Sequence, residues 1–259
     1  YILTSKYQNT TMEKRLVLIR HGQSEWNKLN LFTGWKDVDL SEQGKEEAVQ
    51  AGKAMLEYGV RPEICFTSYL KRAIKTLNIA LDTMNLDYLP VTKSWHLNEK
   101  HYGQLQGLNK KETAERYGDD QVLRWRRVFD CQPPALEKDD ERSPFQDPRY
   151  KNVDSKSLPL TESLKDCIAR CMPYFNETIL PEFKTHDTIL IAAHGNSLRG
   201  IVKNLKQMTE DEIIKFNIPT GIPYLFTFDE NLQLKEDRFL ADEKTVKELM
   251  DAVANQGKR

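Results

Sequence analysis

Two short apolar segments, each ending in a histidine and a glycine, constrain the fold of this chain most strongly. The segments cover residues 16–22 and 189–195, and they place His21 and His194 at equivalent positions. Neither apolar run alternates with polar residues, which is typical of strands in a parallel sheet that is covered on both faces. The glycine permits positive φ and close backbone approach, and a helix-like segment follows. Each unit therefore predicts a strand, a tight turn and the start of a helix.

The repeated pattern also predicts where a ligand binds. In open α/β sheets, ligands bind beyond the carboxyl ends of the strands, where helix N-termini present N–H groups to anions. A single histidine at a strand end is most often a hydrogen-bonded structural residue, but two of the five histidines in this chain share the same context. Zinc is a weaker alternative, because neither His21 nor His194 has a His, Cys or carboxylate partner at ligand spacing. We therefore expect one anion-binding crevice without a metal.

Alternating strand and helix patterns along the chain predict an α/β fold. Helices are expected near residues 41–58, 70–81, 162–181 and 197–206, and further strands near residues 63–66 and 90–92. Residues 224–228 and 232–240 flank Asp229-Glu230-Asn231 and predict a hairpin that adds an edge strand. The expected architecture is a three-layer sandwich with a mostly parallel central sheet and one antiparallel edge strand.

Length and polarity predict one domain with an insertion. A chain of 259 residues can bury a sizeable core, and residues 12–240 are expected to form a single α/β domain. A long polar insertion at about residues 100–159 contains helical pieces near 110–117 and 120–129 and a proline-rich loop. Insertions of this size usually shape a binding site or a lid.

The two ends of the chain are expected to lie outside this domain. Residues 1–11 precede Met12, lack the apolar core of a secretory signal and are interpreted as a mobile N-terminal extension. Residues 241–259 predict an amphipathic helix that ends in a mobile tail.

Charge and cysteine content exclude several classes of function. The 38 lysines and arginines nearly balance the 39 acidic residues, so the chain has no basic field of the kind that dominates nucleic-acid binding. No apolar stretch approaches the length of roughly 18 residues that spans a membrane. The four cysteines form no disulfide framework, so we expect reduced thiols and a cytoplasmic protein. Any anion site must therefore be local.

Two arginines complete a predicted phosphate pocket. Arg20 directly precedes His21, and Arg72 lies in the first turn of a helix that follows another strand. Taken alone, Arg72 would be interpreted as a solvated residue, but guanidinium groups bind phosphate oxygens in a bidentate manner. Neighbouring positive charge should lower the pKa of His21 and leave a ring nitrogen free to attack. This predicts phosphoryl transfer with one histidine as the nucleophile and the other stabilising the transferring group.

The segment Leu18–Asn27, which reads LIRHGQSEWN, resembles the signature of the histidine phosphatase superfamily, specifically of its cofactor-dependent phosphoglycerate mutases. An Arg-His-Gly triplet alone would be weak support, but further blocks follow in the same order along most of the chain. These blocks are residues 32–35, 67–73, 97–103, 125–127, 193–197 and 218–221. The resemblance makes residues 12–240 a catalytic domain.

The resemblance implies a role for each matching residue. His21 would be the phosphorylated nucleophile, and Glu99 would donate and accept the proton of the substrate hydroxyl. The transferring phosphoryl group would be held by Arg20, Arg72, His194 and Asn27. From its sequence context alone, Glu99 would be a solvated loop acid, so its role depends on the resemblance.

A second cluster would grip the substrate carboxylate and the phosphate that is not reacting, and it would separate a mutase from a phosphatase. It consists of Tyr102, Lys110, Arg126 and Arg127. Adjacent arginines on an ideal helix face different ways, so an ordinary solvated pair is the alternative unless a helix end brings them together. Further substrate contacts are implied for Ser24, Thr33, Gly34, Gly195 and Asn196. Serine at position 24 favours the glycolytic enzyme over a bisphosphoglycerate mutase.

These implications define the leading hypothesis and its alternatives. The chain is expected to interconvert 3-phosphoglycerate and 2-phosphoglycerate through phospho-His21, primed by 2,3-bisphosphoglycerate. The insertion or the C-terminal tail would close over the pocket, and the protein would be a homodimer or homotetramer. The alternatives are a phosphatase of the same superfamily, a bisphosphoglycerate mutase, and a noncatalytic phospholigand-binding protein, against which the intact set of site residues argues.

Overall fold

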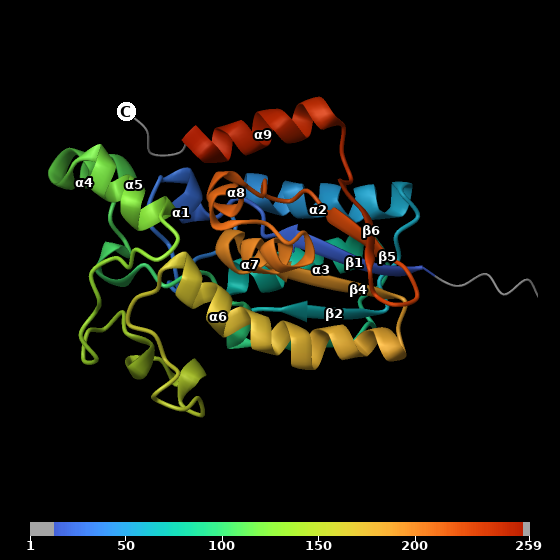
Figure 1. Cartoon of the computed structure of the whole chain (residues 1–259), viewed down its shortest axis with the longest axis horizontal. Helices are drawn as coiled ribbons and strands as arrows, with labels where there is room; N and C mark the ends of the chain where they lie inside the picture. Colours follow the sequence, from blue (N-terminus) through green and yellow to red (C-terminus); the bar gives the residue numbers. More distant parts are fainter. Residues whose placement is uncertain (1–12, 256–259) are drawn as a thin grey trace, which may run out of the picture.

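A six-stranded sheet organises the computed structural model, which describes residues 13–255 (Figure 1). The strand order is β3-β2-β4-β1-β5-β6. The strands are β1 (Lys14–Arg20), β2 (Ile64–Thr67), β3 (Val91–Lys93), β4 (Thr188–Ala193), β5 (Tyr224–Phe228) and β6 (Leu234–Phe239). The predicted extension at residues 1–11 and the last four residues of the predicted tail lie outside the described part of the chain.

The sheet is mostly parallel, which confirms the predicted fold class. Strand β4 pairs in parallel with β1 and β2, and β2 pairs in parallel with β3. The antiparallel pairings lie at one edge, where β5 runs antiparallel to both β1 and β6. Because the predicted hairpin adds two strands rather than one, the reversed strand β5 lies one position inside the edge and β6 forms the edge itself.

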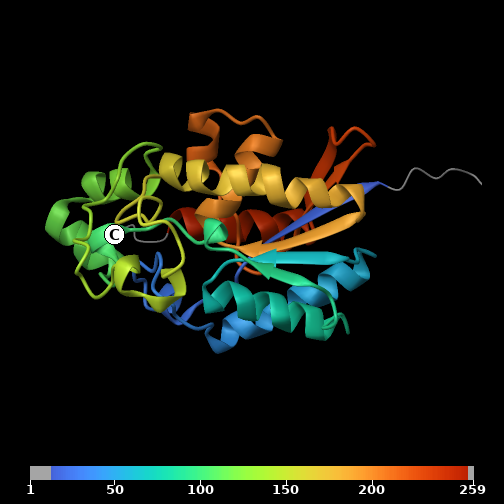
Figure 2. The same cartoon turned by 90° about the horizontal axis from the view of Figure 1, so that it is seen from below.

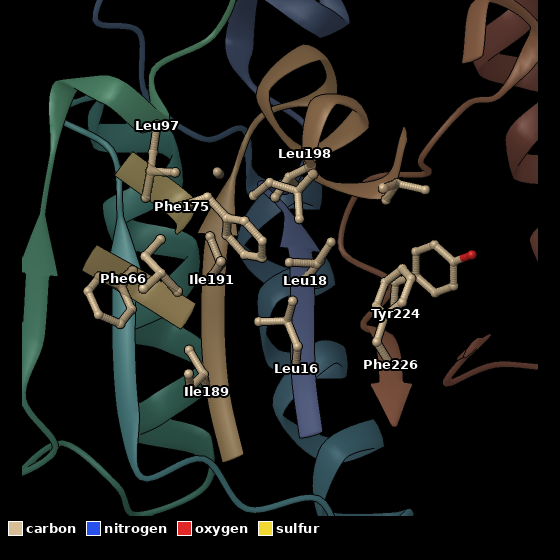
Figure 3. Packing of buried hydrophobic residues seen from close by; sticks show 14 of the residues in the cluster. Leu16, Leu18, Phe66, Leu97, Phe175, Ile189, Ile191, Leu198, Tyr224 and Phe226 are labelled. Atoms are coloured by element: carbon tan, nitrogen blue, oxygen red, sulfur yellow. The ribbon is translucent and has the colours of Figure 1, made fainter. Parts of the chain in front are cut away.

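Helices cover both faces of the sheet. Figure 2 shows α2 (Glu42–Glu57) and α3 (Lys71–Thr83) on one face, and α6 (Leu164–Tyr174) and α7 (Gly195–Leu205) on the other. Within β1, Leu16 and Leu18 belong to the apolar cluster beneath α7, whereas the intervening Val17 and Ile19 belong to the cluster beneath α2 and α3 (Figure 3). Both faces of β1 are thus buried, which explains why its sequence does not alternate.

The expected helix at residues 162–181 is interrupted in the structure. The α-helix α6 ends at Tyr174, and the chain continues as a π-helical turn over Phe175–Ile179 and a 3-10 turn over Leu180–Lys184. Proline lacks the N–H that an α-helix needs in its interior, and Pro173 lies within the last turn of α6. The sequence therefore located the helical segment correctly but not the change in its winding.

The predicted insertion lies at the carboxyl end of the parallel strands, together with the short helix α1 (Glu25–Lys28) (Figure 1). It contains α4 (Lys110–Tyr117) and α5 (Asp119–Arg127), close to the predicted ranges. A separate small apolar cluster anchors it through Phe32, Leu105, Ala114, Val122 and Trp125. The insertion is therefore fixed beside the strand ends that carry the two histidines.

The C-terminal part of the chain adds two helices. Sequence analysis missed α8 (Glu210–Lys215), although Thr209 and Glu212 form the reciprocal hydrogen bonds of a capping box. The predicted terminal helix is present as α9 (Glu243–Asn255), which runs back toward α1 and α5 (Figure 1). No helix within residues 13–255 is long and apolar enough to cross a membrane.

Candidate active site

The register of the central strands brings the two strand-end histidines together. Arg20, the last residue of β1, is paired with Ala193, the last residue of β4, so His21 and His194 leave the sheet side by side. Their ring centroids lie 5.0 Å apart, and their exposed fractions are 3% and 0%. The predicted crevice is therefore present at the carboxyl ends of β1 and β4.

One cavity contains nearly all of the predicted site residues. Its lining includes Arg20, His21, Asn27, Thr33, Gly34, Arg72, Glu99, Tyr102, Lys110, Arg126, Arg127, Gly195 and Asn196. Of the predicted set, Ser24 and His194 are absent from this lining. Ser24 is fully buried, and its hydroxyl accepts a hydrogen bond from the Asn27 backbone N–H at 3.1 Å. Ser24 therefore caps α1 and orients Asn27 instead of facing the cavity.

The hydrogen bonds of His21 leave one ring nitrogen available. Nδ1 lies 2.7 Å from the carbonyl oxygen of Gly22, which can only accept, so Nδ1 carries the proton of the neutral ring. Nε2 faces Arg72, whose Nε donates to it over 3.3 Å. Burial, followed by the charges of Arg72 and Arg20, holds the pKa of His21 well below its ordinary value. The predicted pKa direction is confirmed, and burial is its main cause.

His194 presents a different nitrogen to the site. Its Nε2 lies 2.7 Å from the Ser68 hydroxyl, which already accepts a hydrogen bond from the backbone N–H of Leu70. The Ser68 proton is thus available to Nε2, an arrangement that favours the proton of the neutral ring on Nδ1. This Nδ1 is buried and has no protein partner. Burial and the charge of Arg72 also lower the pKa of His194 well below its ordinary value.

The glycines that follow the histidines serve packing, since neither has a positive φ. A Cβ added to Gly22 would lie 2.2 Å from the carbonyl oxygen of Gly44 in α2. A Cβ added to Gly195 would lie 3.5 Å from Nε of Arg20 and 3.7 Å from Oε2 of Glu99. Neither position therefore uses the positive φ that glycine permits. The close backbone approach is confirmed at Gly22, whereas the distances at Gly195 are those of ordinary contact.

The two arginines are held by backbone carbonyl groups. Arg72 is 1% exposed and donates to Gly34 O at 2.7 Å and Lys36 O at 2.9 Å, which excludes the solvated alternative. Arg20 donates through Nη1 to Ile218 O at 2.8 Å, and its buried Nε has no protein partner. Burial lowers the pKa of Arg72 to about 10, so its guanidinium stays charged at neutral pH. The two arginines place fixed positive charge beside His21.

Glu99 is buried rather than solvated, with an exposed fraction of 8%. Its Oε1 accepts hydrogen bonds from the backbone N–H groups of Lys100 at 2.7 Å and Asn196 at 3.1 Å. Asn196 lies in the first turn of α7, directly after His194 and Gly195. The carboxylate of Glu99 is therefore fixed at the start of α7, within the same cavity as His21.

The second cationic cluster lines the same cavity from the insertion. Arg126 and Arg127 are the last two residues of α5, and this helix end lets both reach the cavity. Arg127 donates to Asn217 Oδ1 at 2.7 Å and to the carbonyl oxygen of Val253 in α9 at 3.3 Å. Burial, followed by the charge of Arg126, lowers the pKa of Lys110 to about 7. Arg126 and Arg127 are thus only partly exposed and are not an ordinary solvated pair.

Two loop residues complete this part of the cavity. Gly34 has a φ of +53°, and a Cβ there would lie 3.2 Å from Tyr102 N, so the position favours glycine. The hydroxyl of Thr33 is buried without a protein partner. Tyr102 accepts a long hydrogen bond of 3.5 Å from the side chain of Asn196, which links the insertion to α7.

Sequence analysis missed several residues that shape the site. It did not name Arg199 among the site residues, although this residue lines the cavity, donates to Asn196 Oδ1 at 3.1 Å and also bonds the carbonyl oxygen of Ile213. Lys100 is fully buried and donates to Trp125 O at 2.9 Å, and burial lowers its pKa to about 8. The available signals were the position of Lys100 beside Glu99 and that of Arg199 one helical turn beyond Gly195.

Within residues 13–255 no group of three or more His, Cys, Asp and Glu side chains could hold a metal ion. The absence of a metal from the reaction stays a prediction.

Sequence relatives point to one class of enzyme. Residues 16–143 match the family model of the histidine phosphatase superfamily, branch 1. The chain is 62% identical over 246 residues to a 2,3-bisphosphoglycerate-dependent phosphoglycerate mutase of Porphyromonas gingivalis, covering 95% of this chain and 99% of that protein. It is 59% identical over 243 residues to a protein of the same name from Hydrogenobaculum sp., covering 94% and 98%.

Solved structures with a similar fold are more distant. A mycobacterial glucosyl-3-phosphoglycerate phosphatase in complex with VO3 superposes with a TM-score of 0.66 at 22% identity, covering 88% of this chain and 100% of that one. The alpha-ribazole phosphatase from Shigella flexneri gives a TM-score of 0.63 at 20% identity, covering 85% and 94%. At such identities the similarity shows a shared fold alone.

Proposed function

This chain belongs to the histidine phosphatase superfamily and, within it, to the 2,3-bisphosphoglycerate-dependent phosphoglycerate mutases, and we propose that it interconverts 3-phosphoglycerate and 2-phosphoglycerate in glycolysis. In this proposal it is an isomerase that acts as an intramolecular phosphotransferase. One observation carries the assignment: the cluster of Lys110, Arg126 and Arg127 shares a single cavity with His21. A substrate that carries a phosphate and a carboxylate needs His21 for the transfer and the cationic cluster to bind its other anionic group.

His21 is the nucleophile in this proposal. Its Nε2 has a lone pair because the bond from Nδ1 to Gly22 O holds the ring proton on the other side. The depressed pKa keeps the ring neutral at physiological pH, so no proton must leave before Nε2 attacks phosphorus. The bond from Nε2 to phosphorus forms as the bond from phosphorus to the substrate oxygen breaks.

Glu99 handles the substrate proton. The oxygen that leaves phosphorus needs a proton, and the hydroxyl that later attacks phospho-His21 must lose one. Glu99 lies in the same cavity as His21, and backbone N–H groups hold its Oε1. This fixed carboxylate can serve as acid in one direction and as base in the other.

Unpartnered donors support a phosphoryl site beside His21. Nε of Arg20, Nδ1 of His194 and Oγ1 of Thr33 are buried without protein partners, and Arg20 and Thr33 line the cavity. Buried polar atoms are costly unless they are hydrogen-bonded, and phosphate oxygens are suitable acceptors. Together with Arg72 and Asn27, these groups would stabilise the equatorial oxygens during transfer.

The same donors fit the primer, 2,3-bisphosphoglycerate. Its two phosphates and its carboxylate match a cavity that is lined by two sets of cationic side chains, namely Arg20 and Arg72 beside His21, and Lys110, Arg126 and Arg127 from the insertion. When bound, it supplies the phosphoryl group that His21 carries. Phospho-His21 would donate this group to the free hydroxyl of the monophosphorylated substrate, and the bisphosphate so formed would reorient and return its other phosphoryl group to His21.

Exclusion of water decides between a mutase and a phosphatase. Hydrolysis of phospho-His21 would convert each transfer into phosphate release. The cavity is covered by α5 and by α9, which are connected through the bond from Arg127 to Val253. This contact supports the expected closure by the insertion and the C-terminal helix.

The test supplies 3-phosphoglycerate with and without trace 2,3-bisphosphoglycerate and follows 2-phosphoglycerate and free phosphate separately. A mutase forms much more 2-phosphoglycerate than free phosphate, and its rate depends on the primer. Dominant release of free phosphate identifies the phosphatase alternative instead, and accumulation of 2,3-bisphosphoglycerate identifies the bisphosphoglycerate mutase. The His21→Ala variant should lose turnover, and activity near that of the wild type would contradict the proposed nucleophile.

The wider setting of the enzyme follows from the family. We propose a cytoplasmic protein with a single catalytic domain over residues 12–240, without a nucleic-acid or membrane partner, that assembles as a homodimer or homotetramer. Light scattering on the purified protein distinguishes the two assemblies from each other and from a monomer.

A further inference from the structure

Arg170 on α6 binds the backbone that carries Glu99. Its side chain is 6% exposed and belongs to the helix layer behind the cavity. Nη1 donates to the carbonyl oxygens of Trp95, His96 and Asn98 at 3.2, 2.9 and 3.1 Å, and Nη2 donates to that of Glu99 at 3.1 Å. One guanidinium therefore holds four carbonyl groups of a single five-residue segment, 95–99.

Glu162 extends this hold to the other side of Glu99. Its carboxylate accepts from Nε and Nη2 of Arg170 at 2.7 and 2.8 Å. The same carboxylate accepts from the backbone N–H of His101 at 2.8 Å, and the N–H of Glu162 donates to His101 O at 2.8 Å. The ion pair thus fixes the chain both before and after the segment Glu99-Lys100.

Trp35 holds the same carbonyl group from a third direction. Its indole Nε1 donates to Glu99 O at 2.6 Å, and the guanidinium carbon of Arg170 lies 5.3 Å from the centre of a Trp35 ring. Arg170 is not part of the cavity lining, and it donates to the carbonyl of Glu99, whereas the Glu99 carboxylate accepts from the backbone N–H groups of Lys100 and Asn196. The hydrogen bonds of Arg170 therefore act on the backbone that carries this carboxylate.

A buried ion pair by itself seldom raises the free energy of unfolding. Removing two charges from water costs free energy that their attraction often fails to recover, so well-packed apolar residues would serve as well. The fork of the guanidinium explains the choice of residue here. Arginine offers five N–H donors in one plane, whereas the ammonium group of lysine offers three donors at one point and cannot span four carbonyls and a carboxylate.

We propose that Arg170, together with Glu162, is a positioning residue that holds the Glu99 carboxylate where it can exchange a proton with the substrate oxygen. This inference rests on the proposed function, in which Glu99 is the acid and base. Displacement of a catalytic group by about 1 Å can cost 100-fold in rate. Arg170 therefore controls proton transfer from outside the cavity.

The first test compares two reactions of the Arg170→Lys variant, one with 3-phosphoglycerate and primer and one with an aryl phosphate. With 3-phosphoglycerate and primer, kcat should fall by about 100-fold while KM changes little. An aryl phosphate with a good leaving group needs no proton on the departing oxygen, so formation of phospho-His21 from it should be nearly unchanged. An equal loss of rate in both reactions would show general damage to the site and would overturn the proposal.

The second test is a double-mutant cycle with Glu99→Gln. If Arg170 acts only through Glu99, adding Arg170→Lys to Glu99→Gln should cause no further loss of mutase rate. Multiplied losses would overturn the proposal. Failure of the proposed function is distinguishable, because the wild-type protein itself would then not convert 3-phosphoglycerate into 2-phosphoglycerate. A Glu99→Gln variant that retained mutase activity would contradict the role of Glu99 instead.

Two further variants control for folding. Glu162→Gln keeps the size of the side chain but removes its charge. It should therefore lose mutase rate but not the reaction with the aryl phosphate, with a smaller loss than Arg170→Lys.

Arg142 is the matched control, because it also pairs with a carboxylate, that of Asp140, and donates to the carbonyl of Gln106. Arg142→Lys removes a comparable fork without touching residues 95–99, so kcat should stay within a few-fold of the wild type. A loss in Arg142→Lys as large as in Arg170→Lys would overturn the assignment to Glu99.

Discussion

His21 and His194 have rings 5.0 Å apart at an angle of 59°, yet they offer opposite hydrogen-bonding groups to the site. His21 directs Nδ1 to Gly22 O and leaves Nε2 unprotonated, where it accepts a hydrogen bond from Nε of Arg72. His194 directs Nε2 to the Ser68 hydroxyl and leaves a buried Nδ1 without a protein partner. In the proposed function, His21 attacks phosphorus through Nε2 and His194 donates to a phosphate oxygen through Nδ1.

Ser68 should matter to catalysis through the tautomer of His194. In Ser68→Ala the hydroxyl that favours Nδ1–H is lost, so we expect phosphoryl transfer to slow by about 10-fold with little change in KM. Ser68→Thr keeps the hydroxyl and should retain most of the activity. Single-turnover formation of phospho-His21 measures the step directly. Equal rates for the alanine and threonine variants would contradict this role.

The cationic cluster of Lys110, Arg126 and Arg127 should affect substrate binding more than the reaction at His21. Charge-assisted hydrogen bonds contribute about 1.5 to 3 kcal/mol, so Arg126→Ala and Arg127→Ala should each raise KM for 3-phosphoglycerate by about 10- to 100-fold. Phosphorylation of His21 by an aryl phosphate, which lacks the carboxylate, should change much less. Arg124→Ala is the matched control, since Arg124 lies on the same helix but is exposed. Equal losses with 3-phosphoglycerate and with the aryl phosphate would argue against this role of the cluster.

Lys110 should impose a pH dependence on substrate capture. Burial lowers its pKa to about 7, so the free enzyme loses this positive charge as the pH rises through neutrality. We expect kcat/KM for 3-phosphoglycerate to decline above about pH 7, because this ratio reports the ionisation of free enzyme. Lys110→Arg keeps the charge and should remove the decline, whereas Lys111→Arg on the exposed neighbouring residue should not. An unchanged profile in Lys110→Arg would exclude Lys110 as the titrating group.

His101 should make the protein less stable in mild acid. Burial lowers its pKa from 6.5 to about 3, so below pH 6.5 the unfolded chain binds a proton that the folded protein excludes. The free energy of unfolding should then fall with decreasing pH, by up to about 1.4 kcal/mol per pH unit for this group. His101→Asn retains an acceptor for the N–H of Gly103, which bonds His101 Nδ1. Urea unfolding between about pH 4 and 6.5 should show a shallower slope in this variant, and an identical slope would contradict the assignment.

Local sequence patterns were sufficient for the sheet and for the two histidines and two arginines of the phosphate pocket. Apolar runs without alternation identified β1 and β4 as buried strands, and the shared His-Gly pattern placed His21 and His194 at one sheet edge. Family resemblance then selected residues that line a single cavity. Neither Gly22 nor Gly195 adopts the positive φ that glycine permits, and at Gly22 close packing against Gly44, a partner remote in the sequence, leaves no room for a side chain.

The sequence by itself determined which residue types end the strands of this protein, because strand periodicity and helix starts are local properties of the chain. Only the tertiary structure decided which ring nitrogen of His194 lacks a protein partner and how the Glu99 backbone is held. Those properties depend on Ser68, Arg170 and Glu162, whose hydrogen bonds cross long stretches of sequence. A hydrogen bond needs atoms about 3 Å apart, and no pattern along the chain encodes that distance.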